Sequence, residues 1–165
     1  MVLSSFDNNN PLRDQQPSRS ERSPFCVLYA GDADLHYIFH LLVRKTLGEN
    51  RHVFSIWASG EPEVRMFWTH IRFHCAFLVL NNILVQYSPN PNKRVRSVVA
   101  LIPWMRAQSS AAIITFSGWF YRGIEEEALH GGADRFFTLP FPVMEVVDLL
   151  RERFGKPEGE YEGRA

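Results

Sequence analysis

The stretch GGADRFFTLPFPVMEVVDLL, residues 131–150, is the part of the sequence that decides the fold. Its two leading glycines end a helical stretch, as glycines at the C-termini of helices commonly do. RFFTL at 135–139 then has the short, aromatic-rich character of a strand. Pro142 opens a segment whose apolar residues share one helical stripe, at Val143, Val146, Val147 and Leu150. The stretch therefore predicts a strand followed by an amphipathic helix.

The same strand–helix unit recurs when the sequence is followed outward from this stretch. Apolar runs predict strands at 25–30, 52–58, 75–81 and 111–116. Helices are predicted at 35–46, 59–71 and 122–132, with a further apolar helix from about Val95. We expect Asp34 to cap the first helix, Gly48 to end it, and Pro62 to lie near the first turn of the second. Pro103 must kink or restart the helix that begins near Val95.

Five strand–helix units in strict alternation predict an α/β fold, namely a five-stranded parallel sheet that is doubly wound, with helices on both faces. The predicted domain covers residues 24–154. Residues 1–23 and 155–165 are polar and lack periodicity, so they cannot bury enough surface to offset the entropy of ordering. We expect both segments to be flexible tails.

The composition excludes several classes of function. Lys plus Arg equals Asp plus Glu at 18 each, so the chain has no net positive charge to attract nucleic acid. Its apolar runs are far shorter than the ~20 residues needed to span a bilayer, and the polar N-terminus does not resemble a secretory signal. Cys26 and Cys75 lie in apolar, strand-like contexts and are expected to be core residues rather than a disulfide. These features predict a cytoplasmic location.

Ligands of doubly wound sheets bind beyond the carboxyl ends of the strands, where the strand order reverses. The residues that follow the predicted strands are therefore the candidate site. They are Ala30-Gly31-Asp32, Asn81-Asn82, Ser117-Gly118 and Leu139-Pro140.

Residues 131–150 resemble the end of the response-regulator receiver domain, whose usual pattern is G-A-D-x-[FY]-hydrophobic-x-K-P-F followed by an amphipathic helix. The resemblance extends over nearly all of residues 25–154 and implies the flavodoxin-like, CheY-like receiver fold. Aligned with this family, Asn82 takes the place of the phosphoryl-accepting Asp, and Ala30 and Gly31 take the places of the acidic pair. Ser117 keeps the position of the switch Ser/Thr, and Leu139 replaces the family's Lys.

These replacements remove the chemistry of phosphoryl transfer. The nucleophile must be an anionic oxygen, Mg²⁺ needs hard carboxylate ligands, and the transferred oxygens need a nearby cation. Asn82 is neutral, Ala30 and Gly31 cannot bind a metal, and Asp32 lies one residue late. The resemblance implies a receiver fold, whereas the chemistry of these residues implies a degenerate pseudo-receiver that is not an enzyme and holds no cofactor or metal.

Several site residues leave alternatives open. Asn81 and Asn82 either bond to neighbouring backbone and end the strand, or bind a ligand, or deamidate to an acceptor Asp. Ser117 is either a static hydroxyl or a switch, and Asp32 either a capping residue or a metal ligand. The resemblance implies a cis Leu139–Pro140 bond. It also places Phe136 on the surface through which receivers commonly pair.

Three consecutive aromatic residues follow the fourth predicted strand: Trp119, Phe120 and Tyr121. They either fill the emptied pocket or form a docking patch for a partner.

Two pairs of histidines have helical i, i+4 spacing, namely His36 with His40 and His70 with His74. Neither pair has further metal ligands nearby in the sequence. Glu125, Glu126 and Glu127 are expected to form a solvated first turn. The motifs that bind dinucleotides and phosphates, and the hydrolase elbow, are absent.

The leading hypothesis is a stand-alone degenerate receiver that acts by protein–protein interaction, since the chain ends shortly after its last predicted helix. Its partner is expected to be a signalling protein, either a histidine kinase or another receiver. The output surface would be helix 122–132, strand 135–139 and helix 142–154, with a homodimer through this face as one form. Two alternatives are a small-ligand or anion sensor that uses the vacated pocket, and a residually active phosphorelay receiver that uses Asp32 or Asp34.

Overall fold

The computed structural model describes residues 23–48, 51–83, 98–118 and 123–155. The strands are β1 (Phe25–Ala30), β2 (Val53–Ala58), β3 (Cys75–Val79), β4 (Ala112–Gly118) and β5 (Arg135–Leu139). The helices are α1 (Ala33–Leu47), α2 (Glu61–His70), α4 (Leu101–Gln108), α5 (Ile124–His130) and α6 (Val143–Phe154). Every strand pairs in parallel, in the order β2-β1-β3-β4-β5. The predicted five-stranded, doubly wound parallel sheet is confirmed.

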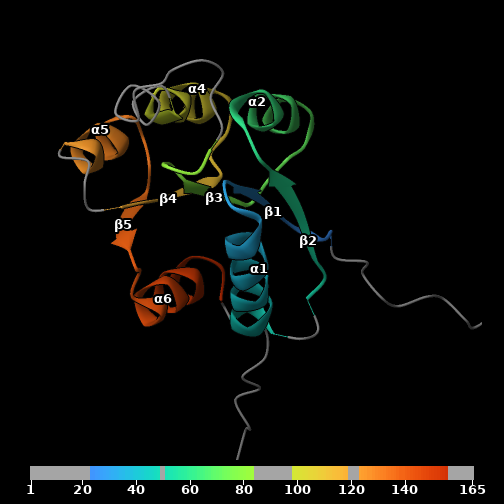
Figure 1. Ribbon diagram of the computed structural model, residues 1–165. Coiled ribbons are helices and arrows are strands. Elements are labelled where there is room, and N and C mark those ends of the chain that lie inside the picture. Colours follow the sequence, from blue (N-terminus) through green and yellow to red (C-terminus); the bar gives the residue numbers. More distant parts are fainter. Residues whose placement is uncertain (1–22, 49–50, 84–97, 119–122, 156–165) are drawn as a thin grey trace, which may run out of the picture.

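Helices cover both faces of the sheet. Helices α1 and α6 lie on one face, and α2, α4 and α5 lie on the other (Figure 1). Strand β3 is in the middle of the sheet, and all five of its residues are buried. A strand that is covered on both faces needs apolar side chains on both, which is why its sequence is a continuous apolar run.

The α1/α6 face is packed largely with aromatic rings. Phe39 of α1 is buried, and its ring centroid lies 4.9 Å from Phe77, 4.7 Å from Phe116 and 5.2 Å from Phe141. Phe77 belongs to β3 and Phe116 to β4, while Phe141 lies between β5 and α6. A single side chain of α1 therefore joins three separate parts of the fold.

The first helix begins at a different cap from the one predicted. Asp32, not Asp34, is the N-cap of α1, and its Oδ1 accepts a 2.8 Å hydrogen bond from the backbone N–H of Asp34. The prediction of Asp34 as the cap is wrong, because an N-cap keeps extended backbone and the helix has already begun at Ala33. Gly48 ends α1, as predicted, and Pro62 lies in the first turn of α2.

Two strands at the site end elsewhere than predicted. Strand β3 ends at Val79 rather than Asn81, because the chain turns there and the N–H of Asn82 donates to the carbonyl oxygen of Val79 at 3.0 Å. Strand β4 continues to Gly118 rather than ending at Phe116, because its last residues still pair with β5. Ser117 and Gly118 therefore lie within the strand rather than after it.

Pro103 restarts a helix rather than kinking one. Residues 98–99 are helical, Ala100 is in a turn, and α4 begins at Leu101. Pro103 is therefore in the first turn of α4, where its missing N–H costs no hydrogen bond. Val95, where the helix was predicted to begin, lies outside the described residues.

The cysteines are free, as predicted, with Cys75 buried and Cys26 partly exposed. His36 and His40 share one side of α1, with ring centroids 6.4 Å apart. His74 lies beyond the end of α2, and its Nδ1 accepts a 3.0 Å hydrogen bond from the N–H of Cys26. No helix within the described residues is long and apolar enough to span a bilayer.

Candidate functional site

The ends of β1, β3, β4 and β5 meet at the carboxyl edge of the sheet, as the sequence predicted. Gly31 lies against β3, and a Cβ placed on it would be 3.4 Å from the Cβ of Asn82. The N–H of Gly118 donates to Oδ1 of Asn81 at 3.3 Å, and Gly118 pairs with Leu139 across to β5. The structure therefore brings together Ala30 and Gly31, the two asparagines, Ser117 and Leu139.

The backbone of Gly31 leaves no room for a side chain at this position. Its φ is +129°, in a region that residues with a Cβ rarely adopt. A Cβ there would lie 2.9 Å from the Cβ of Val79 and 3.3 Å from its carbonyl oxygen. The carbonyl of Gly31 also accepts a 2.9 Å hydrogen bond from Nε1 of Trp57. A carboxylate at position 31 would thus require this edge of the sheet to rearrange.

We expect Gly31→Asp to lower the free energy of unfolding by roughly 2–4 kcal/mol, the sum of backbone strain and overpacking. Gly48→Asp is the matched control, because Gly48 also has a positive φ, of +90°, but would place its Cβ in open space. Urea denaturation of both variants measures the difference. Equal destabilisation of the two would contradict the close approach of Gly31 to Val79.

The two asparagines bond to each other and to strand β4. Nδ2 of Asn81 donates to Oδ1 of Asn82 at 2.7 Å, while Oδ1 of Asn81 accepts from Gly118. Asn81, rather than Asn82, is therefore the residue that reaches the end of β4. The contact of Asn81 with the backbone of Gly118 agrees with the alternative in which the asparagines bond to neighbouring backbone. The sequence did not show which of the two amides makes this contact, since both have the same chemistry.

Ser117 is a buried hydroxyl without a hydrogen-bond partner. It is fully buried, and its Oγ has no partner within the described residues. The other buried hydroxyl of β4, on Thr115, donates to the carbonyl oxygen of Arg135 at 3.0 Å. A buried polar group that lacks a hydrogen bond costs free energy, so Ser117 is a buried side chain of this site with unused bonding capacity.

Two carboxylates follow β1, and both belong to the start of α1. Asp32 and Asp34 are exposed, with Asp32 as the N-cap and Asp34 in the first turn. Negative charge there is favourable because the N-terminus of a helix is the positive end of its dipole. Asp32 thus follows the capping alternative that the sequence left open.

The turn after β5 is apolar. The Leu139–Pro140 bond is cis, as the resemblance implied. Leu139 and Phe141 are partly buried and pack against the aromatic cluster on the α1/α6 face. Phe136 is also partly buried and packs against the core on the opposite face. Leu139, the position that the resemblance aligns with the family's lysine, is therefore packed among apolar residues. Trp119, Phe120 and Tyr121 lie outside the described residues.

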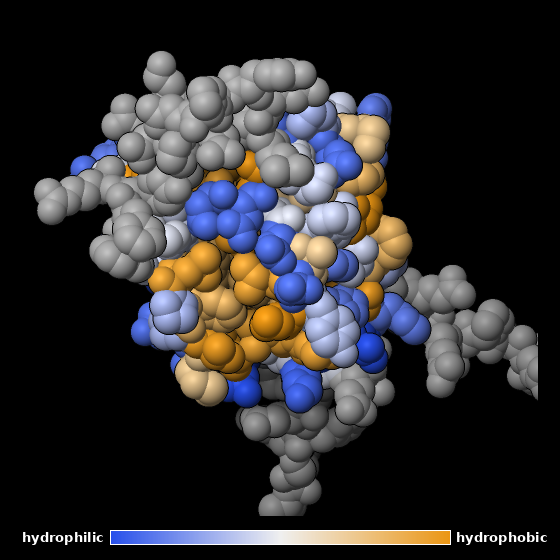
Figure 2. Space-filling view, in the orientation of Figure 1, coloured by the Kyte–Doolittle hydropathy of each residue, from blue (hydrophilic) through white to orange (hydrophobic). Residues whose placement is uncertain are grey.

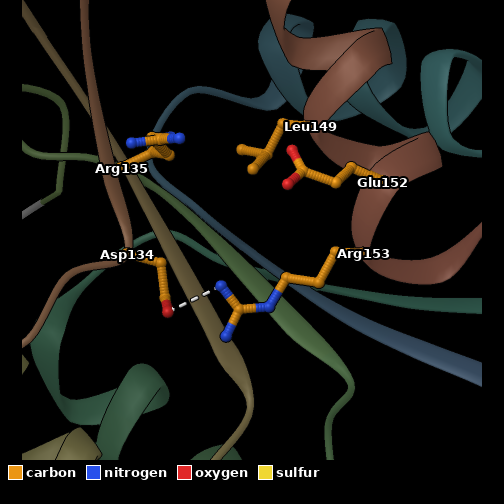
Figure 3. Close-up of a pocket in the computed structure, with 5 residues that line it drawn as sticks. All are labelled: Asp134, Arg135, Leu149, Glu152 and Arg153. Carbon is orange, nitrogen blue, oxygen red and sulfur yellow. Dashed lines mark ion pairs between the residues drawn. The ribbon is translucent and has the colours of Figure 1, made fainter.

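A polar cavity near the other end of β5 is separate from this edge. It is lined by Asp134, Arg135, Leu149, Glu152 and Arg153 (Figure 3). Asp134 precedes β5 and Arg135 begins it, whereas the candidate site lies where β5 ends. The side chain of Asp134 is bonded to Arg106 at 2.6 Å and to Arg153 at 2.7 Å. These bonds join α4, β5 and α6 and give the cavity wall a structural role.

Solved structures that superpose on this chain include receiver domains. A two-component response regulator from Clostridium difficile superposes with a TM-score of 0.62 at 12% identity, over 83% of this chain and 100% of that chain. A response regulator receiver protein from Pseudomonas putida superposes with a TM-score of 0.58 at 18% identity, over 78% and 96%.

A third structure includes a partner. It is the receiver domain of a Saccharomyces cerevisiae response regulator, crystallised with a histidine phosphotransfer signalling protein. Its TM-score is 0.56 at 17% identity, over 79% of this chain and 88% of that chain. No family model matches the sequence, and the curated proteins include no match. The strand order, the cis bond after β5 and these superpositions agree: the chain has the CheY-like fold of response-regulator receiver domains.

Proposed function

We propose that the protein is a degenerate receiver that signals by binding another protein and takes no phosphoryl group on Asp. The observation that carries this proposal is the backbone of Gly31, whose positive φ and contact with Val79 exclude a side chain where the family has a carboxylate. A changed residue alone could be restored by one substitution. At position 31, however, the surrounding structure also leaves no room for an acidic side chain. The two free cysteines suit a reducing compartment, so the proposal includes a cytoplasmic location.

The remaining strand ends agree with this proposal. Asn81 and Asn82 are neutral amides that use their polar atoms on each other and on β4. Leu139 packs into apolar surroundings and supplies no cation. A phosphoryl transfer site needs a nucleophile, a metal site and a cation together, and these residues provide none of the three.

Exposed apolar residues mark the surface for a partner. Leu129 of α5 and Val143 and Met144 of α6 are exposed large apolar side chains on the elements of the predicted output surface. On the face shown in Figure 2, apolar residues gather over α6 and neighbouring α1. A signalling protein such as a histidine kinase or another receiver is the proposed partner. The yeast receiver fold in complex with a phosphotransfer protein supports this class. A homodimer through the α5–β5–α6 surface stays a prediction.

The test is incubation with acetyl phosphate and Mg²⁺, followed by intact-mass measurement, with beryllofluoride and Mg²⁺ added in a parallel NMR titration. We expect no mass gain and no shift of the amide signals near β3. A receiver with a complete acidic pair and lysine, treated in parallel, shows that the donors are active.

Asn81→Asp and Asn82→Asp sharpen the experiment, because each restores one carboxylate and nothing else. We expect both variants to remain without an adduct, since the acidic pair and the cation are still absent. A stoichiometric adduct on the unaltered chain, at Asp32, Asp34 or β3, would sink the proposal. An adduct on either variant would show that only the nucleophile had been lost.

The buried hydroxyl of Ser117 favours a second candidate function, a sensor of a small ligand or anion. The Oγ of Ser117 has no partner among the described residues, and it precedes Gly118, whose N–H bonds to Asn81, so it offers a hydrogen bond that a ligand at this strand end can use. Thermal melting with inorganic phosphate and a panel of small anions tests this candidate. Stabilisation that disappears in Ser117→Ala would favour the sensor. The absence of stabilisation by any anion would favour the proposal that the protein acts by binding another protein.

A further inference from the structure

Strand β2 forms one outer edge of the sheet and is unusually free of protection. It pairs only with β1, and no described residue continues the sheet beyond it (Figure 1). Its six residues, VFSIWA, include no charged residue and no proline. Phe54 is 50% exposed and Trp57 is 42% exposed. Edge strands of soluble proteins are usually blunted by charges, proline or bulges, because their open backbone groups pair with other strands.

The opposite edge of the sheet shows the usual protection. Strand β5 begins with the exposed, charged Arg135, carries the exposed Thr138, and is followed at once by Pro140. The two edges of one sheet thus differ in the features that prevent pairing. The difference points to β2 as the edge at which another strand adds.

We propose that β2 pairs antiparallel with β2 of a second copy of this chain, so that two sheets join into one across a twofold axis. With Ser55 opposite its own counterpart, Phe54 faces Ile56 of the second copy and Val53 faces Trp57. Phe54 and Ile56 lie on the α2/α4/α5 face of the sheet, and Val53 and Trp57 lie on the α1/α6 face. Both faces therefore gain apolar or aromatic cross-strand pairs, the kind that stabilises antiparallel ladders.

Charge does not oppose a second copy, and the register of β2 suits one. The six residues of β2 bear no charge, so they match another uncharged strand and leave no ionised group unpaired. The whole chain has equal numbers of acidic and basic residues, and two copies therefore meet without net repulsion at neutral pH. A twofold contact also requires a self-complementary patch, and this register of β2 provides one. The pairing leaves the α5–β5–α6 surface open to a signalling partner.

Sedimentation velocity over a wide range of protein concentration tests the proposal. We expect the unaltered chain to approach twice its monomer mass of 19.1 kDa, and Phe54→Lys to weaken the association roughly tenfold or more. Met66→Lys is the matched control, because Met66 is also 50% exposed but belongs to α2 and not to the edge strand. It should dimerise like the unaltered chain. Thermal melts of both variants confirm that they are folded.

A charge-swap experiment tests the register. In the proposed pairing, the two copies of position 54 are diagonal neighbours about 7–8 Å apart, within reach of long side chains. Phe54→Lys and Phe54→Glu should each be largely monomeric, and an equimolar mixture should form the heterodimer. Failure of the mixture to associate would overturn the antiparallel register.

Hydrogen exchange gives an independent reading. Val53, Ser55 and Trp57 point their backbone groups away from β1, because the alternate residues of β2 are the ones that bond to it. Their amides should become more protected as protein concentration rises, while those of β5 should not change. A chain that stays monomeric at every concentration would overturn the proposal, as would a dimer that Phe54→Lys leaves intact. Disruption of such a dimer by Arg135→Glu instead would assign the contact to the β5 side and support a homodimer there.

Discussion

Replacing Phe39 by alanine is expected to lower the free energy of unfolding by about 3–5 kcal/mol, the range for removing a large aromatic side chain from a core. Phe39 is 1% exposed, and its ring packs on Phe77, Phe116 and Phe141 within 5.2 Å between centroids. The cavity would open among three rigid parts of the fold, so collapse around it is limited. Urea denaturation followed by tryptophan fluorescence or circular dichroism measures the loss.

Tyr37→Ala on the same helix is the control. Tyr37 is 64% exposed, and it lies two residues before Phe39, on a different side of α1 from the buried Phe39 and Val43. Its removal should change the stability by less than about 0.5 kcal/mol, as surface substitutions commonly do. If Phe39→Ala were as mild as Tyr37→Ala, α1 could not be anchored to the sheet through this ring.

Replacing Asp134 by alanine is expected to cost roughly 2–4 kcal/mol, because one carboxylate holds several groups that would be left unpaired. Its oxygens accept bonds from the backbone N–H of Ile113 at 2.7 Å, from Arg106 at 2.6 Å and from Arg153 at 2.7 Å. Figure 3 shows the contact with Arg153. The side chain is only 18% exposed, so water cannot fully replace these partners.

The loss should also depend on pH. Burial alone would raise the pKa of Asp134, but the Ile113 amide and the two arginines outweigh it and hold the pKa below its ordinary 3.8. A carboxylate with a lowered folded-state pKa stabilises the fold above pH 3.8, and this stabilisation is lost as the pH falls through the folded-state pKa. The stability difference between the unaltered chain and Asp134→Ala should therefore be largest near neutral pH and shrink in acid.

Asp148→Ala is the matched control for this measurement. Asp148 forms a 3.7 Å contact with Arg151 on the surface of α6, with its side chain 69% exposed. Its removal should change stability by less than about 1 kcal/mol at any pH. A difference between Asp134→Ala and the unaltered chain that stayed constant down to acid pH would show that the carboxylate acts through packing rather than charge.

The order of strands and helices could be read from the sequence because each unit carries its own local signals. RFFTL was placed correctly at 135–139, and the helix after it begins beside Pro142. Two strand boundaries were predicted wrongly, for different reasons. Strand β4 continues to Gly118 because β5 lies beside it, and that pairing is not visible in a local window of sequence. Strand β3 stops at Val79 because the N–H of Asn82 closes a local turn on its carbonyl oxygen, although the apolar run continues through Leu80.

The candidate site shows the same division. The sequence predicted that Gly31, Asn82, Ser117 and Leu139 lie at one edge of the sheet. Each stands at the end of a predicted strand, and the carboxyl ends of parallel strands share an edge. The sequence could not tell which asparagine reaches β4, since both amides have the same chemistry. The contact of Asn81 with Gly118 depends on how the chain turns after Val79.

By itself, then, the sequence determined that this chain forms a doubly wound parallel sheet and that uncharged residues, Gly31, Asn82, Ser117 and Leu139, stand at or near its strand ends. Periodicity and residue chemistry are local properties, so they can be read from the sequence without knowledge of the fold. Only the tertiary structure decided that position 31 has no space for an acid, since that depends on Val79 of a different strand. It also decided that β2 lies at an open edge, because strand order arises from crossovers between distant segments.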